Sequence, residues 1–558
     1  EARFGEPFKK ELERLSMDKI GGTDEEKKEF FQRVVASFPD VFWVEGCPPP
    51  TVKNKWVKFR VKENVKPTAR QPIPVSPYDD LRVEFHIEQN LYEGKLRKIE
   101  PTKGDPLPEW STPVFVVDQD AKGLLGRLVC AYGLVNAAME LPSFPSADPQ
   151  RAFEMAAGKE HHTVVDAIWG YTQFLLDEET KKLLVICTRS GLYEWTRMPF
   201  GPAPAPAEMQ SYVAGKFGSL RNAKGKEFVS PCMDDLKVSS ESFEEHVKDL
   251  TILLSKAREE GFEFKLKKAQ FNQKQLEFWG CILDGQGHRP QPKKIEQLRE
   301  WPVPTDASGV NSFLCFVNYL REYLPPDWVK HEAVLKPFRK KDVNFRQVWD
   351  SDSKYLKAFE AIRSAMAEGV VVNHVDYDAA ASPEESGRPY EMFIDASDYG
   401  WCACLCQRPE PGKAPKIVSI LAKGFTDVQQ RWSAMERELY ALWQGVVGHE
   451  RMIRGFKVFC YIDHKNNIFS DAQLDNRRRS KKMCNWALEL QQFNTERIWI
   501  RGEANILADA PSRAPWENRL AQYLPIPDAP VRDLVIQMYQ DPDGLEQAVS
   551  ARRKVLTG

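Results

Sequence analysis

The sequence predicts a multidomain protein of mixed α/β and α+β class. The chain has 558 residues, 42% of them hydrophobic, and a prior of about 150 residues per domain gives at least three domains. Short β-branched or aromatic runs end in acidic residues, as at Asp166 and Asp395. Other segments repeat apolar residues at helical spacing, as in 243–257 and 435–446. Both kinds of element recur along the chain, so a single all-helical or all-strand domain is excluded.

Helix-breaking and linker-like residues predict where one part of the chain ends and the next begins. A mixed-charge helical segment ends at Cys47-Pro-Pro-Pro, and an Asp-, Ala-, Ser-, Pro- and Glu-rich stretch near residue 380 is typical of a linker. Within residues 51–290, Ser242 and Glu245 predict the start of a helix, and Gly261 predicts the end of the same helix. The expected parts are an N-terminal helical segment (1–50), strands and helices (51–290), helices (291–375), a linker (376–390), a second strand-and-helix set (391–515) and a tail (516–558).

Composition narrows the setting in which the chain works. No apolar run approaches the ~18 residues that a membrane span needs, and the charged N-terminus lacks the apolar stretch of a signal peptide. The first residue is not Met, so we expect a fragment or a processed product. The 11 cysteines show no Cys-x-x-Cys pair and no zinc-ligand spacing, as in reduced intracellular proteins. We therefore expect an intracellular protein, in the cytoplasm or also in the nucleus, without membrane contact.

Adjacent acids mark the first candidate site. Asp234 and Asp235 stand at a predicted turn between short apolar strands, where each carboxylate raises the pKa of the other. Such pairs are common in surface turns, but a divalent cation would also explain them. A third acid, Asp166, ends a β-branched strand-like run. Together the three could hold two metal ions about 3.5–4 Å apart, which suits in-line displacement at phosphorus.

A second set of acids begins at Asp395. Asp395 and Asp463 end strand-like runs, whereas Glu438 and Asp509 lie in or next to helical patterns. Four acids gathered at one sheet edge would form a second two-metal site.

The helix that supplies the glutamate offers two candidates, Glu436 and Glu438. Met435, Leu439, Leu442 and Val446 predict an amphipathic helix that begins after Ser433. Glu436 stands three residues after Ser433, so it is expected to complete a capping box. Glu438 is therefore the expected site residue.

The order of the motifs identifies a family. The chain resembles the reverse transcriptase–ribonuclease H part of a gypsy-type LTR retrotransposon Pol polyprotein, over about residues 30–515. The matching runs, in family order, are Trp110-Ser-Thr-Pro-Val-Phe-Val-Val, Arg127 to Asn136, Asp166 with Gly170, Tyr171 and Gln173, Met198-Pro-Phe-Gly201, Cys232-Met-Asp-Asp235, Phe278-Trp-Gly280, Trp301-Pro-Val-Pro and Asn318-Tyr-Leu-Arg-Glu-Tyr. Glu438 also matches the family's catalytic position.

The resemblance implies a right-hand polymerase with fingers and palm (51–290) and thumb (291–375), followed by a ribonuclease H-like mixed-sheet domain (391–515). The implied activities are RNA- and DNA-templated DNA synthesis and cleavage of RNA in RNA–DNA hybrids. Each site would use two Mg²⁺ ions, or Mn²⁺. The implied partners are RNA and DNA template-primer, hybrid and deoxynucleoside triphosphates, with a homodimer or larger assembly left open.

The resemblance also assigns roles to residues outside the acid sets. Arg127 would contact the triphosphate, and Phe200 would pack near the nucleotide. Tyr171 would lie under the incoming sugar and exclude a 2′-hydroxyl, although an ordinary strand-edge aromatic is the alternative. Trp279 and Gly280 would guide the primer terminus.

Positive charge must be segregated, because the formal net charge is only −2. The candidates are Lys265, Lys267 and Lys268 beside the palm, and a later run with Arg477, Arg478, Arg479, Lys481 and Lys482. Such runs are often just solvated surface. The later run lies between two predicted catalytic acids, which favours contact with hybrid phosphates.

The chain departs from the family at its nucleotide-handling surface. Ala131 and Gly133 replace an Asp and an Arg, Pro202-Ala-Pro204 replaces Leu-x-Asn, and Cys232 replaces an aromatic. Three hypotheses remain: a working polymerase with ribonuclease H, a domesticated nucleic-acid-binding or scaffold protein, and an intact ribonuclease H behind a weakened polymerase. All seven acids are present, which favours chemistry over decay.

Overall fold

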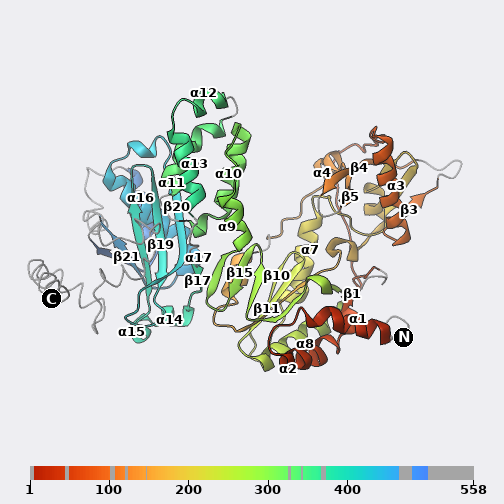
Figure 1. The fold of residues 1–558 in the computed structure, drawn as a ribbon, viewed down its shortest axis with the longest axis horizontal. Coiled ribbons are helices and arrows are strands. Elements are labelled where there is room, and N and C mark those ends of the chain that lie inside the picture. The colour runs from red at the N-terminus through yellow and green to blue at the C-terminus, as the bar shows by residue number, and fades with distance from the viewer. Residues whose placement is uncertain are drawn as a thin grey trace, which may run out of the picture. The chain divides into compact units, whose positions relative to one another are not determined.

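The structure is a computed structural model, and it describes residues 6–43, 49–100, 107–119, 123–145, 148–324, 328–340, 343–365, 372–463 and 481–500. The chain divides into two compact units, 1–279 and 280–558. Figure 1 shows the elements of each unit. No helix in the described ranges is long and apolar enough to cross a membrane.

The first unit is built around an antiparallel sheet in the order β10-β11-β6-β13, formed by Val229–Cys232, Asp235–Ser240, His161–Asp166 and Gln270–Gln273. Every residue of β6 is buried, and its neighbours β11 and β13 pair with both of its edges. Helix α8 (Phe243–Glu260) packs on this sheet. Its predicted ends are confirmed: the Ser242 side chain accepts a hydrogen bond from the Glu245 N–H, and Gly261 ends the helix at φ 70°.

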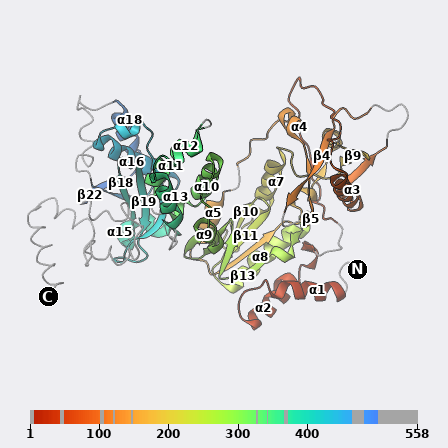
Figure 2. The ribbon, with the colours of Figure 1, turned by 45° about the horizontal axis from the view of Figure 1, so that its top comes forward.

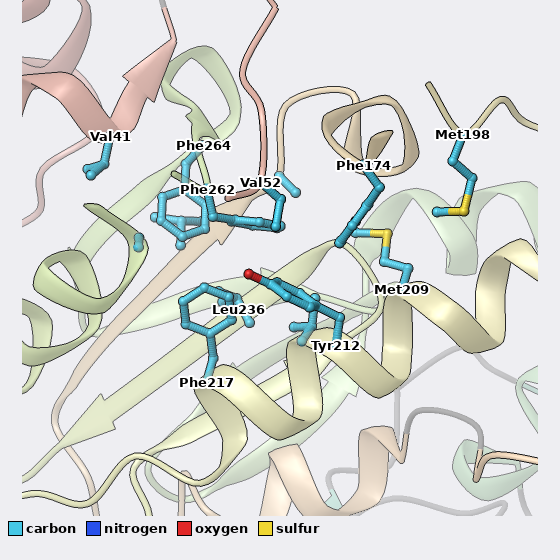
Figure 3. Close-up of a cluster of buried hydrophobic side chains, with 14 of the residues drawn as sticks. Val41, Val52, Phe174, Met198, Met209, Tyr212, Phe217, Leu236, Phe262 and Phe264 are labelled. Atoms are coloured by element: carbon cyan, nitrogen blue, oxygen red, sulfur yellow. The ribbon is translucent and has the colours of Figure 1, made fainter. Parts of the chain in front are cut away.

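Aromatic side chains fill the space beneath this sheet. Figure 3 shows Tyr212 and Phe217 facing Phe262 and Phe264. The ring centroids of Phe217 and Phe262 are 5.3 Å apart, and the Tyr212 hydroxyl donates to Glu260 at 2.9 Å. This packing fixes α7 (Ala205–Val213), which carries Tyr212, relative to the strands that hold the acids.

The predicted N-terminal segment belongs to the same core. It comprises α1 (Glu6–Met17), α2 (Asp24–Phe30), η2 (Phe31–Val35), η3 (Pro39–Val41) and β1 (Phe42–Trp43). The Gly21 N–H donates to the Phe271 carbonyl of β13, and the Phe30 ring lies 5.9 Å from the Phe271 ring. The segment therefore closes the β13 edge of the sheet (Figure 2).

The fingers form a second sheet, in the order β3-β9-β8-β4-β5. Its strands are Leu96–Ile99, Gly191–Trp195, Ile186–Thr188, Thr112–Gln119 and Gly123–Cys130, and α3 (Pro77–Tyr92) packs on it. The other elements of this unit are β2 (Trp56–Val57), α4 (Gly133–Ala138), α5 (Pro149–Glu154), η5 (Gly170–Gln173), β7 (Leu175–Leu176), α6 (Glu178–Leu183), η6 (Ala214–Gly218), β12 (Phe264–Lys265), η7 (Leu266–Lys268) and β14 (Gln275–Phe278).

The second unit begins with the thumb segment, which is mostly helical, as predicted. Its strands are β15 (Cys281–Asp284), β16 (Gly287–Pro290) and β17 (Val372–Asn373). Its helices are α9 (Pro292–Arg299), α10 (Ala307–Tyr319), η8 (Arg321–Tyr323), α11 (Trp328–Leu335), η9 (Lys336–Arg339), α12 (Phe345–Trp349) and α13 (Lys354–Ala365).

A mixed sheet follows in the order β20-β19-β18-β21-β22. Its strands are Lys416–Gly424, Gly400–Gln407, Tyr390–Ala396, Val458–Ile462 and Thr495–Trp499. β18 pairs antiparallel with β19 but parallel with β21. Helix α16 (Ala434–Gly448) packs on β18 and β19, and α18 (Lys481–Leu490) packs on α16; η10 (Gln429–Arg431) and α17 (Glu450–Ile453) flank α16.

The segment predicted as a linker contains two short helices, α14 (Tyr377–Ala381) and α15 (Pro383–Ser386). Arg388 and Asp376 form an ion pair at 2.7 Å. The Gln407 side chain donates to the carbonyls of both residues. The segment is therefore attached to β19 by hydrogen bonds at both of its ends, and it is not a free tether.

Candidate active sites

Two neighbouring strands bring the first acids together. Asp235 of β11 is the register partner of Asp166, the last residue of β6. On the other side Cys232 pairs with Asp235, so Met233 and Asp234 form the two-residue turn of the β10–β11 hairpin. The Asp234 carbonyl accepts a hydrogen bond from the Ala167 N–H at 2.8 Å. The predicted arrangement of one acid from a strand and two from a neighbouring hairpin is thus present.

The turn holds a strained residue beside the acids. Met233 has φ 59°, a left-handed conformation that costs a non-glycine residue of order 1–3 kcal/mol. The buried side chain of Gln210, on α7, accepts the Met233 N–H at 2.8 Å. Gln210 therefore fixes the turn that presents Asp234, a role that the sequence did not reveal.

A close approach of α7 also explains a glycine of the Asp166 motif. A Cβ on Gly170 would lie 2.7 Å from the Met209 methyl carbon and 3.5 Å from the Asp234 Cβ. A side chain at this position would therefore require the end of the Met209 side chain to move.

The electrostatics of this acid set fit a cation site. Burial, and then the like charge of Asp166, raises the pKa of Asp234. Burial, followed by Asp234 and Asp166, raises the pKa of Asp235 to about 7. Lys268 lies 3.0 Å from Asp166, and this bond raises the lysine's pKa. Clustered carboxylates with raised pKa values favour a positive partner, so the residues present fit a divalent metal ion.

The three predicted nucleotide-binding residues lie together next to this site. The rings of Tyr171 and Phe200 meet edge to face with centroids 4.8 Å apart. The Arg127 guanidinium lies over Phe200, 5.2 Å from the ring centroid. Burial, and then the charge of Asp234, raises the pKa of Tyr171. The three residues form one path from the fingers strand β5 to the acids.

The turn after Phe200 is held by the strand–helix junction that carries the family departures. The Asn136 side chain donates to the Gly201 carbonyl at 3.1 Å and accepts the Ala203 N–H at 2.8 Å. Gly133 is exposed, and a Cβ there would meet no atom within 4 Å. A substitution at Gly133 would therefore meet no clash at its Cβ.

Trp279 and Gly280 both have positive φ, 48° and 75°. Trp279 is 41% exposed, so part of its ring is open to a partner. A Cβ on Gly280 would overlap the hydroxyl oxygen of Tyr319, at the end of α10. The positive φ favours glycine at this position, and a side chain there would also displace Tyr319.

Three acids of the second set converge at one end of the mixed sheet. Ligand oxygens of Asp395, Glu438 and Asp463 all lie within 4.8 Å of one another. Glu438 is buried, and its Oε2 has no hydrogen-bond partner in the described part of the chain. Burial, and then the charges of Asp463 and Asp395, raises the pKa of Glu438 to about 9. A buried carboxylate oxygen without a partner, facing two further acids, fits a metal ligand.

The two glutamates of α16 have separate positions. Glu436 accepts the Ser433 N–H at 3.0 Å and completes the predicted capping box. Its other oxygen pairs with Lys482 at 3.0 Å. Glu438, and not Glu436, joins the acidic triad. Arg437 donates to Asp398 at 2.5 Å, beside the triad.

The remaining predicted residues of this domain, Asp509, Arg477, Arg478 and Arg479, lie outside the described residues.

Two family models match the chain. A reverse transcriptase (RNA-dependent DNA polymerase) model covers residues 124–283, which includes the first acid set. A model of the RNase H-like domain found in reverse transcriptase covers residues 385–493, which includes the triad. The chain therefore contains a reverse transcriptase domain and an RNase H-like domain of the kind found in reverse transcriptase.

The curated relatives of this chain are polyproteins of retrovirus-related transposons. The Pol polyprotein from the Drosophila melanogaster transposon opus is 24% identical over 88% of this chain and 47% of its own length. The Tf2-3 transposon polyprotein of Schizosaccharomyces pombe is 27% identical over 82% of this chain and 33% of its own. The predicted resemblance is confirmed, and the chain spans a third to a half of these relatives.

Solved structures share the fold of these Pol domains. The foamy viral protease–reverse transcriptase in complex with an RNA/DNA hybrid has a TM-score of 0.69 and 16% identity, over 88% of this chain and 63% of that one. The same protein in complex with double-stranded DNA also gives 0.69 and 16%, over 88% of this chain and 97% of that one. The predicted fold class, a multidomain α/β and α+β polymerase followed by a ribonuclease H-like domain, is confirmed.

Proposed function

We propose that this chain synthesises DNA on RNA and DNA templates and cleaves the RNA strand of RNA–DNA hybrids, as part of a retrotransposon Pol protein. The cross-strand pairing of Asp166 with Asp235, with Asp234 at the adjoining turn, carries the polymerase assignment. The convergence of Asp395, Glu438 and Asp463 supports the ribonuclease assignment.

For synthesis, we assign a part to each of the predicted site residues. Asp166 and Asp234 hold the metal ions, with Asp235 at the periphery. Arg127 contacts the triphosphate, and Tyr171 and Phe200 form an apolar wall beside the sugar and base. Trp279 and Gly280 guide the primer terminus. Gln210 keeps Asp234 in place through the Met233 N–H.

For cleavage, the triad and Asp509 would hold the metal ions, and Arg477, Arg478 and Arg479 would bind hybrid phosphates. We propose two Mg²⁺ ions in each site, or Mn²⁺. When bound, such a pair lowers the pKa of the attacking hydroxyl or water and stabilises charge on the phosphate.

The partners that we propose are template-primer, RNA–DNA hybrid and deoxynucleoside triphosphates, met inside the cell. Primer extension on RNA and on DNA templates, run beside hybrid cleavage with Mg²⁺ or Mn²⁺, tests both activities. Cleavage without extension would leave only the ribonuclease assignment standing. Loss of both would favour a binding or scaffold protein.

Sugar selection gives a direct test of Tyr171. Replacing Tyr171→Ala removes the ring that packs on Phe200 and opens space beside the incoming sugar. Ribonucleotide incorporation should rise relative to deoxynucleotide incorporation, measured as the ratio of the two kcat/KM values. Tyr171→Phe keeps the ring and should keep the wild-type ratio. An active Tyr171→Ala variant with unchanged discrimination would remove Tyr171 from this role.

The departures in the fingers predict weak nucleotide or template binding. Restoring the family pair, Ala131→Asp with Gly133→Arg, should lower the nucleotide KM about ten- to a hundredfold, because a charge-assisted hydrogen bond contributes about 1.5–3 kcal/mol. A Cβ at Gly133 would meet no atom within 4 Å, so the new side chain starts without a clash. Gly133→Arg alone is the control, since it adds an unpaired charge. If the double variant shows no gain in steady-state extension, the chain compensates elsewhere.

A further inference from the structure

The edge strand of the ribonuclease H sheet is not open to solvent along its length. β20 is an end strand of the order β20-β19-β18-β21-β22. An end strand exposes unpaired backbone groups and invites pairing with other chains, so native proteins often cover it. Here the thumb supplies the cover.

One end of β20 receives a thumb side chain. Gly424 of β20 and Gly400 of β19 are register partners. The Val329 Cγ1 of α11 lies where side chains on these two residues would stand, 2.7 Å from a Cβ on Gly400 and 3.5 Å from one on Gly424. Val329 is 3% exposed. The paired glycines thus form a notch that Val329 fills.

Polar contacts from the thumb hold the strand at both ends. Next to the notch, the Lys336 ammonium donates to the Phe425 carbonyl at 3.3 Å. At the start of β20, the Asn373 amide of β17 donates to the Ile417 carbonyl at 3.0 Å. β17 in turn pairs with β16 of the thumb segment. The thumb therefore contacts the ribonuclease H domain at two separate points, one near each end of β20.

A continuous series of contacts joins this interface to the primer-grip glycine. Tyr319 of α10 lies against Gly280. From the same helix, Asn311 donates to the Phe338 carbonyl of η9 at 3.2 Å. η9 directly follows α11, which carries Val329. Each step lies within the second unit.

We propose that α11 acts as a positioning element for the ribonuclease: the thumb and the ribonuclease H domain move as one body, and the docking of Val329 in the Gly400–Gly424 notch sets where a hybrid is cut. This proposal rests on the proposed hybrid cleavage. It assigns Val329 and Lys336 to the choice of cut position, and it gives them no part in the cleavage chemistry itself.

The test compares cut positions with cleavage rate in the full chain. The substrate is a long RNA with a DNA primer, and the cut sites are mapped from the primer 3′ end. Val329→Lys places a longer, charged side chain where Val329 packs, which should weaken docking about tenfold or more, because burying a charge is costly. The cuts should spread over many positions, while the rate on a short hybrid that contacts only the ribonuclease domain stays unchanged.

Milder and matched variants keep this test decisive if Val329→Lys fails to fold. Val329→Ala with Lys336→Met removes the same contacts without burying a charge, and it should also broaden the pattern. Lys330→Ala, on the exposed side of the same helix, should keep the wild-type pattern. A folded Val329→Ala, Lys336→Met variant that cuts at the wild-type positions overturns the positioning role.

A crosslink tests the same proposal in the other direction, because it holds the two domains together instead of weakening their contact. Val329→Cys with Gly424→Cys should join the two domains under oxidising conditions, and the locked protein should keep the wild-type cut positions. Loss of cleavage on locking, recovered on reduction, would show that the domain must leave the thumb, and it would overturn the proposal. If the wild-type chain cuts no hybrid at all, the proposed function has failed instead.

Discussion

Asp234→Asn should abolish primer extension and leave hybrid cleavage intact. The substitution removes a negative charge from the hairpin turn that faces Asp166. Metal-mediated charge stabilisation contributes several kcal/mol to such a transition state, and each 1.36 kcal/mol is tenfold in rate, so the loss should be about a thousandfold or more. Extension and cleavage are measured on the same purified protein.

The informative result of this experiment is that extension is lost while cleavage is kept. Asp234 belongs to the first compact unit, whereas Asp395, Glu438 and Asp463 belong to the second. Asn has nearly the same shape as Asp, so the turn and its bond to Gln210 should survive. Loss of cleavage in a variant with wild-type thermal unfolding would contradict two independent metal sites.

Glu438→Gln should stop hybrid cleavage while extension continues. Glu438 is the buried member of the triad, and its Oε2 has no partner in the part of the chain that the structure describes. Its neutral amide would be a far weaker ligand for a cation between Asp395 and Asp463. We expect a loss of about a thousandfold or more, by the same reasoning on metal-mediated stabilisation.

The matched control stands two residues earlier on the same helix. Glu436→Gln weakens the capping box with Ser433 and the ion pair with Lys482, so it should lower the free energy of unfolding by about 1 kcal/mol. Cleavage at a temperature where both proteins are folded should be unchanged. The reverse pattern, with Glu436→Gln inactive and Glu438→Gln active, would exchange the two assignments.

Short sequence patterns predicted which strand, hairpin or helix carries each of several acids in the two sites. A β-branched run placed Asp166 at the end of a strand, and apolar flanks placed the acid pair at a hairpin, where Asp234 lies in the turn and Asp235 begins β11. The Ser433–Glu436 cap separated two neighbouring glutamates before any coordinates were known. These predictions rest on residues a few positions apart, where geometry follows from sequence.

Contacts between distant segments were harder to predict. Gln210 reaches Met233 only because α7 packs beneath the hairpin, and a glutamine in a helix carries no signal of that contact. The sequence places Lys268 in a basic cluster that is a candidate for phosphate contact, and in the structure its Nζ lies 3.0 Å from the Asp166 carboxylate. Tyr171 and Phe200 were each matched to the family, but their mutual packing was not expected.

Composition alone also could not reveal the structure of residues 376–390. The Asp, Ser, Pro and Gly that are typical of a linker are also the residues that begin and end short helices. Asp376 caps α14 by accepting the Ala379 N–H, Pro383 begins α15, and Gly387 ends it at φ 62°. Only the hydrogen bonds from Gln407 to the Asp376 and Arg388 carbonyls distinguish a segment attached to β19 from a free linker.

The place of the N-terminal segment limits how a polyprotein could be divided around these domains. Phe30, Val34 and Phe42 are fully buried, and each such side chain stabilises the fold by about 1.5–3 kcal/mol. Residues 19–21 also occupy the open edge of β13. A proteolytic cut between residues 6 and 43 would separate the palm from part of its own core, so a maturation site compatible with a stable polymerase must lie outside this stretch.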